Sequence, residues 1–333
     1  MPTPRLDLRS IFTRVSDRPL LDCSAVRWSG HATIMFPTVV NMNEHLKHPL
    51  DHFYLYYASH GGRGIGLATA PHPEGPWTPY ADNPVFTLEQ VPGFRVHISS
   101  PELIFLPEHR RFHLYFHGPT YQGSQHTGMA ISEDGLHFTP VSTGPILLGA
   151  SLTESAPKGW NDPHAAYLRV FRRDGWFYGV FKGAIANGLV RSEDGLHWEH
   201  GPHNPLIEIS EEHREFDRIR HVALMIREPM LYILYSTYTD PERSREAIKL
   251  ASVPMHGTWE DWGPLKRWGE VFAPSLPWEE NNVRDPYLLR HNGTVYLYYV
   301  GGHEKGIALA KMDYPRLTSI LDEFSEDDMA DSL

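Results

Sequence analysis

Cysteine is nearly absent from this chain of 333 residues, in which Cys23 stands alone. A single thiol excludes an intrachain disulfide and a zinc site built from several cysteines. The sequence also contains no run of about 18 apolar residues, which a membrane-spanning helix needs, and its first residues, MPTPRLDLRSIF, lack the apolar stretch of a secretory signal. We therefore expect a soluble, cytoplasmic protein with no membrane partner.

Dense groups of basic residues are missing as well. The formal net charge is −11 at pH 7, so nucleic acid is a poor candidate partner. Helix-forming residues do not dominate, whereas aromatic residues make up 12% of the chain, with 27 glycines and 28 prolines. This composition favours many short strands joined by turns. We predict one all-β domain over residues 1–318, followed by an acidic tail, 319–333, that lacks periodicity and stays disordered.

The chain repeats itself. The segment SEDGLH begins at Ser132 and again at Ser192, and YLYY begins at Tyr54 and at Tyr296. Aligned on this aromatic strand, one unit occurs five times, centred near Tyr56, Tyr115, Val180, Leu234 and Tyr298. Each copy has an apolar strand before it and a strand of small residues after it, and Asp-Gly or Gly-Pro turns supply hairpin chemistry.

Four-stranded units repeated in this way indicate the blades of a propeller. We predict a five-bladed β-propeller whose four-stranded antiparallel blades surround a central funnel. A strand at about residues 20–28 is expected to complete the last blade, because closing the ring removes free sheet edges. The repeated SEDGLH is then a hairpin, and GGRGIG from Gly61 is a turn, because it lacks the strand and helix that flank a nucleotide-binding loop.

With WNDPH at Trp160, VRDPY at Val283 and the repeated YLYY and SEDGLHW segments, the chain resembles the five-bladed propeller glycosidases. That group includes glycoside hydrolase families 43, 62 and 117 and, more distantly, the invertases and levansucrases. The resemblance implies an O-glycosyl hydrolase that needs no cofactor and acts on a small oligosaccharide or glycoside. The expected activity is exo-acting and inverting, on terminal residues of plant or algal oligosaccharides. The site should lie at one axial end, where the innermost strands present carboxylates.

Two carboxyl groups with opposed duties are needed for glycoside hydrolysis. The residues that open the five innermost strands align as Phe36-Pro37, Ser100-Pro101, Asp162-Pro163, His221-Val222 and Asp285-Pro286. We predict Asp162, Asp285 and Glu102 as catalytic residues. The resemblance implies that both Asp-Pro carboxylates match those of family 43 and that Glu102 is its acid, although that family's base lies in the first blade, where this chain has Phe36. Structurally, such Asp residues also cap turns, and Glu102 could be a solvated strand end.

Side chains near these openings are candidate ligands of a sugar. Trp160 could stack on a sugar face, Lys182, Arg220 and Arg284 could hold hydroxyls or a carboxylate, and the resemblance to family 117 makes His221 and His303 candidate acids. The remaining predicted binding residues are Asn161, His164 and His97. Blade packing by the tryptophan and salt bridging by the cations are equally open. An axial cation, calcium or similar, held through His31 and His221, is a further possibility.

Two other functions compete with hydrolysis. A glycoside phosphorylase of the family 130 type would use Arg220, His221 and Lys182 to bind phosphate. A non-catalytic glycan-binding propeller is favoured by Phe36, which stands where family 43 carries an acid. The sugar, its anomer and ring size, and the oligomeric state stay open, because specificity resides in loops with little pattern.

Overall fold

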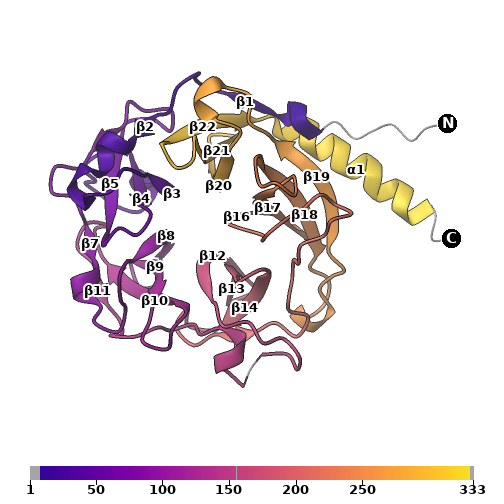
Figure 1. Cartoon of the computed structure of the whole chain (residues 1–333), viewed down its shortest axis with the longest axis horizontal. Helices are drawn as coiled ribbons and strands as arrows, with labels where there is room; N and C mark the ends of the chain where they lie inside the picture. The colour runs from indigo at the N-terminus through magenta and orange to yellow at the C-terminus, as the bar shows by residue number, and fades with distance from the viewer. Residues whose placement is uncertain (1–7, 155, 331–333) are drawn as a thin grey trace.

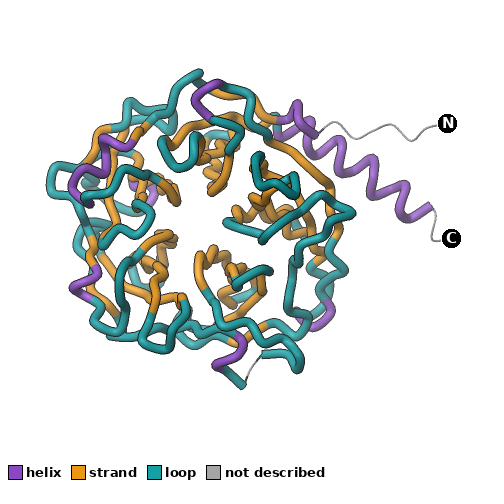
Figure 2. Tube along the Cα trace, viewed as in Figure 1, coloured by secondary structure: helices purple, strands orange, loops and turns teal. Residues whose placement is uncertain are grey.

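Five antiparallel sheets surround a central axis in the computed structural model, which describes residues 8–154 and 156–330 (Figure 1). The prediction of a five-bladed propeller is confirmed, with blades of four or five strands. Figure 2 shows strands converging on the axis while loops and short helices occupy the periphery. No helix within the described ranges is long and apolar enough to cross a membrane.

The blades follow one another along the chain. Blade one contains β3 (Met35–Asn41), β4 (Phe53–Ala58), β5 (Gly64–Ala70), β6 (Thr78–Pro79) and the short β7 (Phe86–Thr87). Blade two contains β8 (Ser99–Leu106), β9 (Arg111–Pro119), β10 (Gln125–Ser132) and β11 (Thr139–Pro140). Blade three contains β12 (Ala166–Arg173), β13 (Trp176–Lys182), β14 (Asn187–Ser192) and β15 (Glu199–His200). Blade four contains β16 (Val222–Arg227), β17 (Met230–Tyr238), β18 (Glu246–Pro254) and β19 (Lys266–Phe272).

Blade five joins the two ends of the chain. It contains β20 (Val283–His291), β21 (Thr294–Gly301) and β22 (Gly306–Met312), and β22 also pairs with β1 (Phe12–Arg14) and β2 (Leu21–Asp22). The strand predicted over about 20–28 is therefore only two residues long. Residues Cys23–Ser29 form the 3₁₀ helix η2 instead, because the Asp22 carboxylate accepts a hydrogen bond from the Ser24 amide and caps it.

The C-terminal segment differs from the disordered tail that we expected. Residues Tyr314–Ala330 form helix α1, which lies outside the ring beside the N-terminal segment (Figure 1). Leu317 and Leu321, one helical turn apart, are buried against the blade-four and blade-five cluster that includes Leu8 and Ile11 of the 3₁₀ helix η1 (Leu8–Ile11). Arg227 of β16 pairs with Asp322 at 2.7 Å. Residues 331–333 lie outside the described residues.

The apolar core is divided among the blade interfaces. One cluster lies between each pair of neighbouring blades, so both faces of a blade are covered. This explains why β4 is buried at every position instead of alternating. The short 3₁₀ helices that remain, all in connections, are η3 (Met42–Glu44), η4 (Leu88–Gln90), η5 (Ala150–Leu152), η6 (Trp259–Asp261) and η7 (Pro277–Glu279).

The two SEDGLH segments form identical turns that join neighbouring blades. In the first, Asp134 Oδ1 accepts hydrogen bonds from the Leu136 and His137 amides, and the Gly135 carbonyl accepts one from Tyr56 of blade one. In the second, Asp194 has the same role and Tyr115 of blade two reaches the Gly195 carbonyl. The motif is a hairpin turn, as its sequence pattern predicts, and it holds neighbouring blades together.

Candidate active site

Four of the five innermost strands contain the same bulge near their start. The pairing register slips there in β3, β8, β12 and β20. The residue inside each bulge has a positive φ, namely 62° for Phe36, 51° for Ser100, 56° for Tyr167 and 50° for Asp285. Such a backbone is strained for residues other than glycine and re-aims the side chain. The bulges therefore mark one end of the axis as a site, which we call the mouth.

The bulge corrects the expected alignment of blade three. Tyr167, not Asp162, is the residue equivalent to Phe36 and Asp285, and Asp162 lies in the loop before β12. The Asp-Pro pattern is a local signal, whereas the register of β12 is set by its hydrogen bonds to β13. Asp162 and Asp285 therefore do not occupy equivalent positions.

Asp285 and His221 form a buried pair at the mouth. The Asp285 carboxylate, which has no exposed surface, pairs with Nδ1 of His221 and accepts a hydrogen bond from the Phe36 amide at 3.3 Å. The His221 ring lies between Phe36 and Tyr167, with ring centroids 4.9 and 4.3 Å away. A carboxylate at Nδ1 selects the tautomer with its lone pair on Nε2. Among the described residues, Nε2 has no hydrogen-bond partner.

Burial and charge set the protonation of this pair. Burial lowers the pKa of His221 below its ordinary value of 6.5, and the nearby Asp285 only partly offsets this. Burial also opposes ionisation of Asp285, but the charge and hydrogen bond of His221, together with Arg284, outweigh it and leave the Asp285 pKa lowered. The His221 charge acts only below the lowered His221 pKa, and above it the pair is a carboxylate that holds a neutral imidazole.

A second imidazole, His60, faces the same cavity. Its Nδ1 lies 3.1 Å from Oε2 of Glu304, and the hydrogen bond that Glu304 accepts from the ring raises the pKa of His60. Glu304 is itself held by Arg284, whose Nη1 lies 2.8 Å from Oε1. The His60 side chain is 72% exposed, so its ring is accessible from solvent. The mouth therefore has two imidazole and carboxylate pairs whose imidazole pKa values move in opposite directions.

The cavity between these pairs has a volume of about 70 Å³. It is lined by Met35, Phe36, His60, Gly61, His97, Ser99, His117, Gln125, Tyr167, Arg220, His221, Arg284 and Glu304. Of the predicted binding residues, the structure brings His97, Arg220, His221 and Arg284 together here. When the surroundings of two titratable groups shift their pKa values apart, the two groups are candidates for a catalytic acid and a catalytic base.

Arginine and carboxylate side chains alternate behind one wall of the cavity. Arg284 Nη2 lies 2.6 Å from Glu246, and Arg220 Nε lies 3.3 Å from the same carboxylate. Arg220 also approaches Asp217 at 3.9 Å. Both guanidinium groups of the lining are therefore engaged with carboxylates.

The residues predicted around Asp162 gather in blade three, outside the residues that line the mouth cavity. Asp162 accepts hydrogen bonds from the His164 amide at 2.8 Å and from the Ala184 amide at 2.9 and 2.8 Å. Lys182 Nζ donates to the Gly183 carbonyl at 2.8 Å, and burial lowers its pKa to about 8. Trp160 packs against Phe181 with ring centroids 5.7 Å apart, which is blade packing. Asn161 is exposed.

Glu102 lies toward the opposite end of the axis. Its carboxylate is 2.6 Å from Nη1 of Arg169 and accepts a hydrogen bond from the Val170 amide, at a separate cavity of about 200 Å³. Burial raises the pKa of Glu102 despite Arg169. Glu102 is therefore not a solvated strand end, and it does not lie beside Asp285.

The histidines proposed for an axial cation do not converge. His31 and His303 are exposed, and Nδ1 of His221 is engaged by Asp285. Across residues 8–154 and 156–330, no three His, Cys, Asp or Glu side chains gather as metal ligands would. The axial cation stays a prediction, and the mouth residues give it no ligand set.

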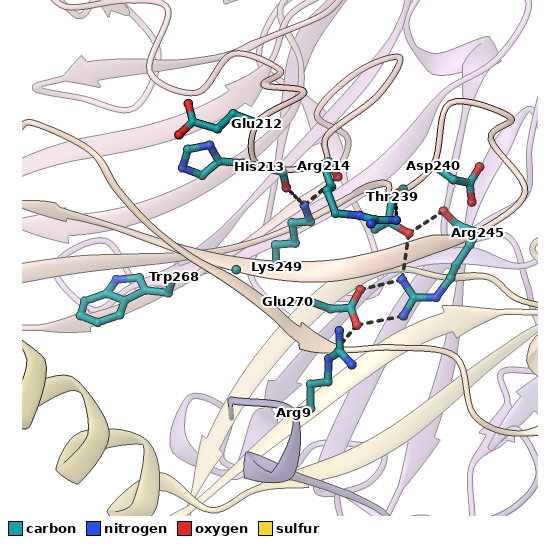
Figure 3. Close-up of a pocket in the computed structure, with 11 residues that line it drawn as sticks. Arg9, Glu212, His213, Arg214, Thr239, Asp240, Arg245, Lys249, Trp268 and Glu270 are labelled. Carbon is teal, nitrogen blue, oxygen red and sulfur yellow. Dashed lines mark hydrogen bonds and ion pairs between the residues drawn. The ribbon is translucent and has the colours of Figure 1, made fainter. Parts of the chain in front are cut away.

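A larger cavity of about 840 Å³ lies in blade four beside β18 and β19 (Figure 3). Lys249 donates a hydrogen bond to the Arg214 carbonyl at 2.8 Å, and Glu270 pairs with both Arg245 and Arg9 (Figure 3). These cations are engaged with protein oxygens. We therefore place the candidate site at the smaller cavity, where the strained and unpartnered groups are.

Sequence reasoning missed His60, Glu304, His117 and Tyr167. One signal was available for the first two, because the turns after YLYY carry His60 in blade one and His303-Glu304 in blade five. Residues in corresponding turns of a propeller face the same end of the axis. Nothing in the local pattern distinguished His117 from other strand histidines.

Comparison with known proteins agrees with the fold. No protein-family model matches the chain. The uncharacterized protein R118 of Acanthamoeba polyphaga mimivirus is 23% identical over 326 residues, which covers 86% of this chain and 85% of that protein.

Solved structures of the same architecture include family 43 glycosidases. A GH43_1 enzyme from Xanthomonas citri, complexed with xylotriose, is 14% identical with a TM-score of 0.62 and 90% of each chain covered. CoXyl43, a GH43 β-xylosidase/α-arabinofuranosidase from a compost microbial metagenome, also with xylotriose, is 15% identical with a TM-score of 0.61, covering 90% of this chain and 95% of that one. An N-acetylgalactosamine deacetylase from F. plautii in complex with blood group B trisaccharide is 11% identical with a TM-score of 0.59, covering 92% and 96%. Identities this low show a shared fold, on which function depends on the site.

Proposed function

We propose that the protein is a glycoside hydrolase that removes a terminal sugar bound at the mouth, with His221 as general base and His60 as general acid. One observation carries this proposal: two imidazoles, each held by a carboxylate, face one cavity with pKa values displaced in opposite directions. The fold shared with glycosidases solved with xylotriose supports a carbohydrate as the substrate.

In the proposed reaction, a water molecule attacks the anomeric carbon while Nε2 of neutral His221 takes its proton. Protonated His60 gives its proton to the glycosidic oxygen as the bond between that oxygen and the anomeric carbon breaks. The products are a free sugar and an alcohol, and one proton has passed from His60 and one to His221. Asp285 stabilises the imidazolium that forms on His221, as a carboxylate behind a histidine base does.

The shape of the cavity supports exo action and inversion. Its small volume, and a floor made by Phe36 and Tyr167, suit one terminal sugar better than an internal stretch of polymer. Among the described residues that line it, Glu304 is the one carboxylate, and His60 and Arg284 hold both of its oxygens. Retention through a glycosyl-enzyme intermediate normally needs two carboxyl groups about 5 Å apart, and the described lining offers one, so direct attack by water with inversion is favoured.

A phosphorylase is less well supported than a hydrolase. Phosphate needs cations that can turn toward it, whereas Arg220 and Arg284 already pair with carboxylates and Lys182 donates to backbone carbonyls. A non-catalytic glycan-binding protein is the second candidate. Phe36 favours it, because an apolar ring lies where the resembling family carries its base.

The test is an activity screen with matched variants. Wild-type protein, His221→Gln and His60→Gln would be incubated with neutral xylo- and arabino-oligosaccharides and with aryl glycosides, with and without phosphate and with and without EDTA. We expect sugar release by the wild type that does not depend on phosphate and falls at least 100-fold in each variant, in the range usual for one acid or base group. The anomer released, followed by NMR, tests inversion.

His303→Gln is the control variant, because His303 lies in the corresponding turn of blade five and is exposed. It should retain wild-type activity. Sugar release that requires phosphate would identify a phosphorylase. A loss of activity in EDTA would support the predicted axial cation. Binding of a sugar without any turnover would identify a glycan-binding protein.

A further inference from the structure

We infer that blade two forms a recognition wall for an uncharged sugar, whose hydroxyl groups bind His117 and Gln125; this inference rests on the proposed function. Both side chains line the cavity and come from neighbouring strands, β9 and β10. They face the acid and base groups, which come from blades one, four and five. Blade two would thus recognise the sugar, while blades one, four and five would supply the groups that transfer protons.

His117 is the central residue of this wall. Its side chain lines the cavity, the residue is 1% exposed, and its ring lies 4.0 Å from that of Tyr167 between centroids. In the part of the chain that the structure describes, neither ring nitrogen has a hydrogen-bond partner. Burial keeps the pKa of His117 well below its ordinary value, so the ring is neutral and offers one N–H and one lone pair. Buried polar atoms without protein partners need another one, and at a cavity wall a water molecule or a ligand hydroxyl can supply it.

One other atom of the wall shares this property. The amide oxygen of Gln125 is buried and, within the described ranges, makes no hydrogen bond of normal geometry, although the His97 ring approaches it. Hydroxyl groups both donate and accept hydrogen bonds, so a sugar can satisfy an imidazole and an amide oxygen together.

The charge around the cavity excludes an anionic sugar. The cations at the cavity, Arg220, Arg284 and protonated His60, are outnumbered by four carboxylates in contact with them or with His221: Asp217, Glu246, Glu304 and Asp285. Burial also lowers the pKa of His97, so that imidazole adds no positive charge. A uronic acid or sugar phosphate would therefore meet a wall whose cations are already neutralised, and electrostatic complementarity favours a neutral ring.

The experiment measures binding without turnover. Saturation-transfer NMR would be recorded on the whole protein with xylose, arabinose and galactose, and with glucuronate and galacturonate. We expect signals from at least one neutral sugar and none from the uronates. In His117→Phe, which removes both nitrogens and keeps a planar ring, the affinity for the neutral sugar should fall at least tenfold. His117→Gln, which keeps a donor and an acceptor, should retain part of it.

His113→Phe is the matched control. His113 lies on the same strand, β9, and has an unpartnered buried Nδ1 in the described structure, but it packs against Phe177 away from the cavity. It should bind the sugar normally. Thermal melting verifies folding, and His117→Phe should melt no lower than the wild type, because no protein hydrogen bond is lost.

Three results would each overturn the inference. The first is unchanged sugar binding in a folded His117→Phe variant, the second is preference for a uronate, and the third is no binding of any neutral sugar. The proposed function fails separately. If the neutral sugar binds through His117 but His60→Gln and His221→Gln lose no activity, or there is no activity to lose, then recognition stands and hydrolysis does not.

Discussion

The two ends of the propeller axis both bury charged side chains, but they satisfy them differently. At the end away from the mouth, Arg169 donates to the Thr38 hydroxyl at 2.7 Å, to Glu102 at 2.6 Å and to the Val222 carbonyl at 3.2 Å. Its guanidinium also lies 5.1 Å from the centre of the Tyr287 ring. Arg169 belongs to blade three and its partners belong to the other four, so one side chain connects every inner strand.

The mouth, by contrast, keeps strained residues and polar atoms without partners. Asp285 and Phe36 adopt positive φ, and His117 has no protein partner among the described residues. Saturated hydrogen bonding stabilises a fold, whereas unsatisfied groups cost stability and persist where a ligand uses them. The comparison teaches that carboxylate burial alone did not identify the site. Glu102 and Asp285 are both buried acids, and their partners distinguish them.

The largest expected effect is at the mouth, in Asp285→Asn. An asparagine can donate its amide N–H to Nδ1 of His221 and so leave the proton on Nε2, where the base needs a lone pair. We expect kcat to fall on the order of 10²–10⁴-fold with little change in KM. Steady-state kinetics on the substrate found in the screen would measure this. A loss confined to KM would make Asp285 a binding residue instead.

The next effect is at the opposite end, in Arg169→Met. Removing one partner of a buried ion pair leaves Glu102 uncompensated, so the free energy of unfolding should fall by about 3–5 kcal/mol. Denaturant unfolding would measure it. The double variant Arg169→Met with Glu102→Gln removes the stranded charge and should recover much of the loss. If the single and double variants are equally destabilised, the ion pair is not the reason.

The pH dependence of activity sharpens the comparison further. His221 must be neutral and His60 protonated, and their pKa values lie respectively below and above 6.5. Activity should therefore rise as pH increases through the His221 pKa, stay high around 6.5 and fall as pH increases through the His60 pKa. In His60→Gln the alkaline fall should disappear from the residual activity. If activity has a narrow maximum whose rise and fall both lie on the same side of pH 6.5, the assignment of the acid and the base is contradicted.

The smallest effect is expected in the SEDGLH turns, which are remote from both ends. Asp134→Ala removes an acceptor of two backbone amides and should lower the free energy of unfolding by about 1 kcal/mol, as loss of a cap does. Asp194→Ala should behave alike, because its turn has the same bonds. Neither substitution should change kcat. A change in kcat in either variant would mean that the turns are coupled to the mouth.

The fold could be predicted because its signals are local and repeated. The five aromatic strands near Tyr56, Tyr115, Val180, Leu234 and Tyr298 are each buried on both faces, so each copy had to be apolar throughout. Helix α1 was missed for a related reason. In the part of α1 whose side chains the structure describes, Leu317 and Leu321 are the fully buried pair, and two leucines are too short a pattern to distinguish a helix from an acidic tail.

The site could be predicted only in part. Asp285 and His221, which an Asp-Pro pair and a strand start mark in the sequence, both lie at the candidate site. Asp162 and Glu102 were misplaced because a bulge and an ion pair depend on partners in other strands, such as Arg169. His117 is a functional candidate because its ring nitrogens have no protein partner among the described residues, and no spacing in the chain encodes such an absence.

Closure of the ring has a consequence for synthesis of the protein. Phe12–Arg14 of β1 is made well before its partner β22, Gly306–Met312. Blades one to four can form as they emerge from the ribosome, but the fifth sheet cannot form until β22 has been made. Because Asp285 belongs to that sheet, the candidate site would be complete only after β22 has been translated.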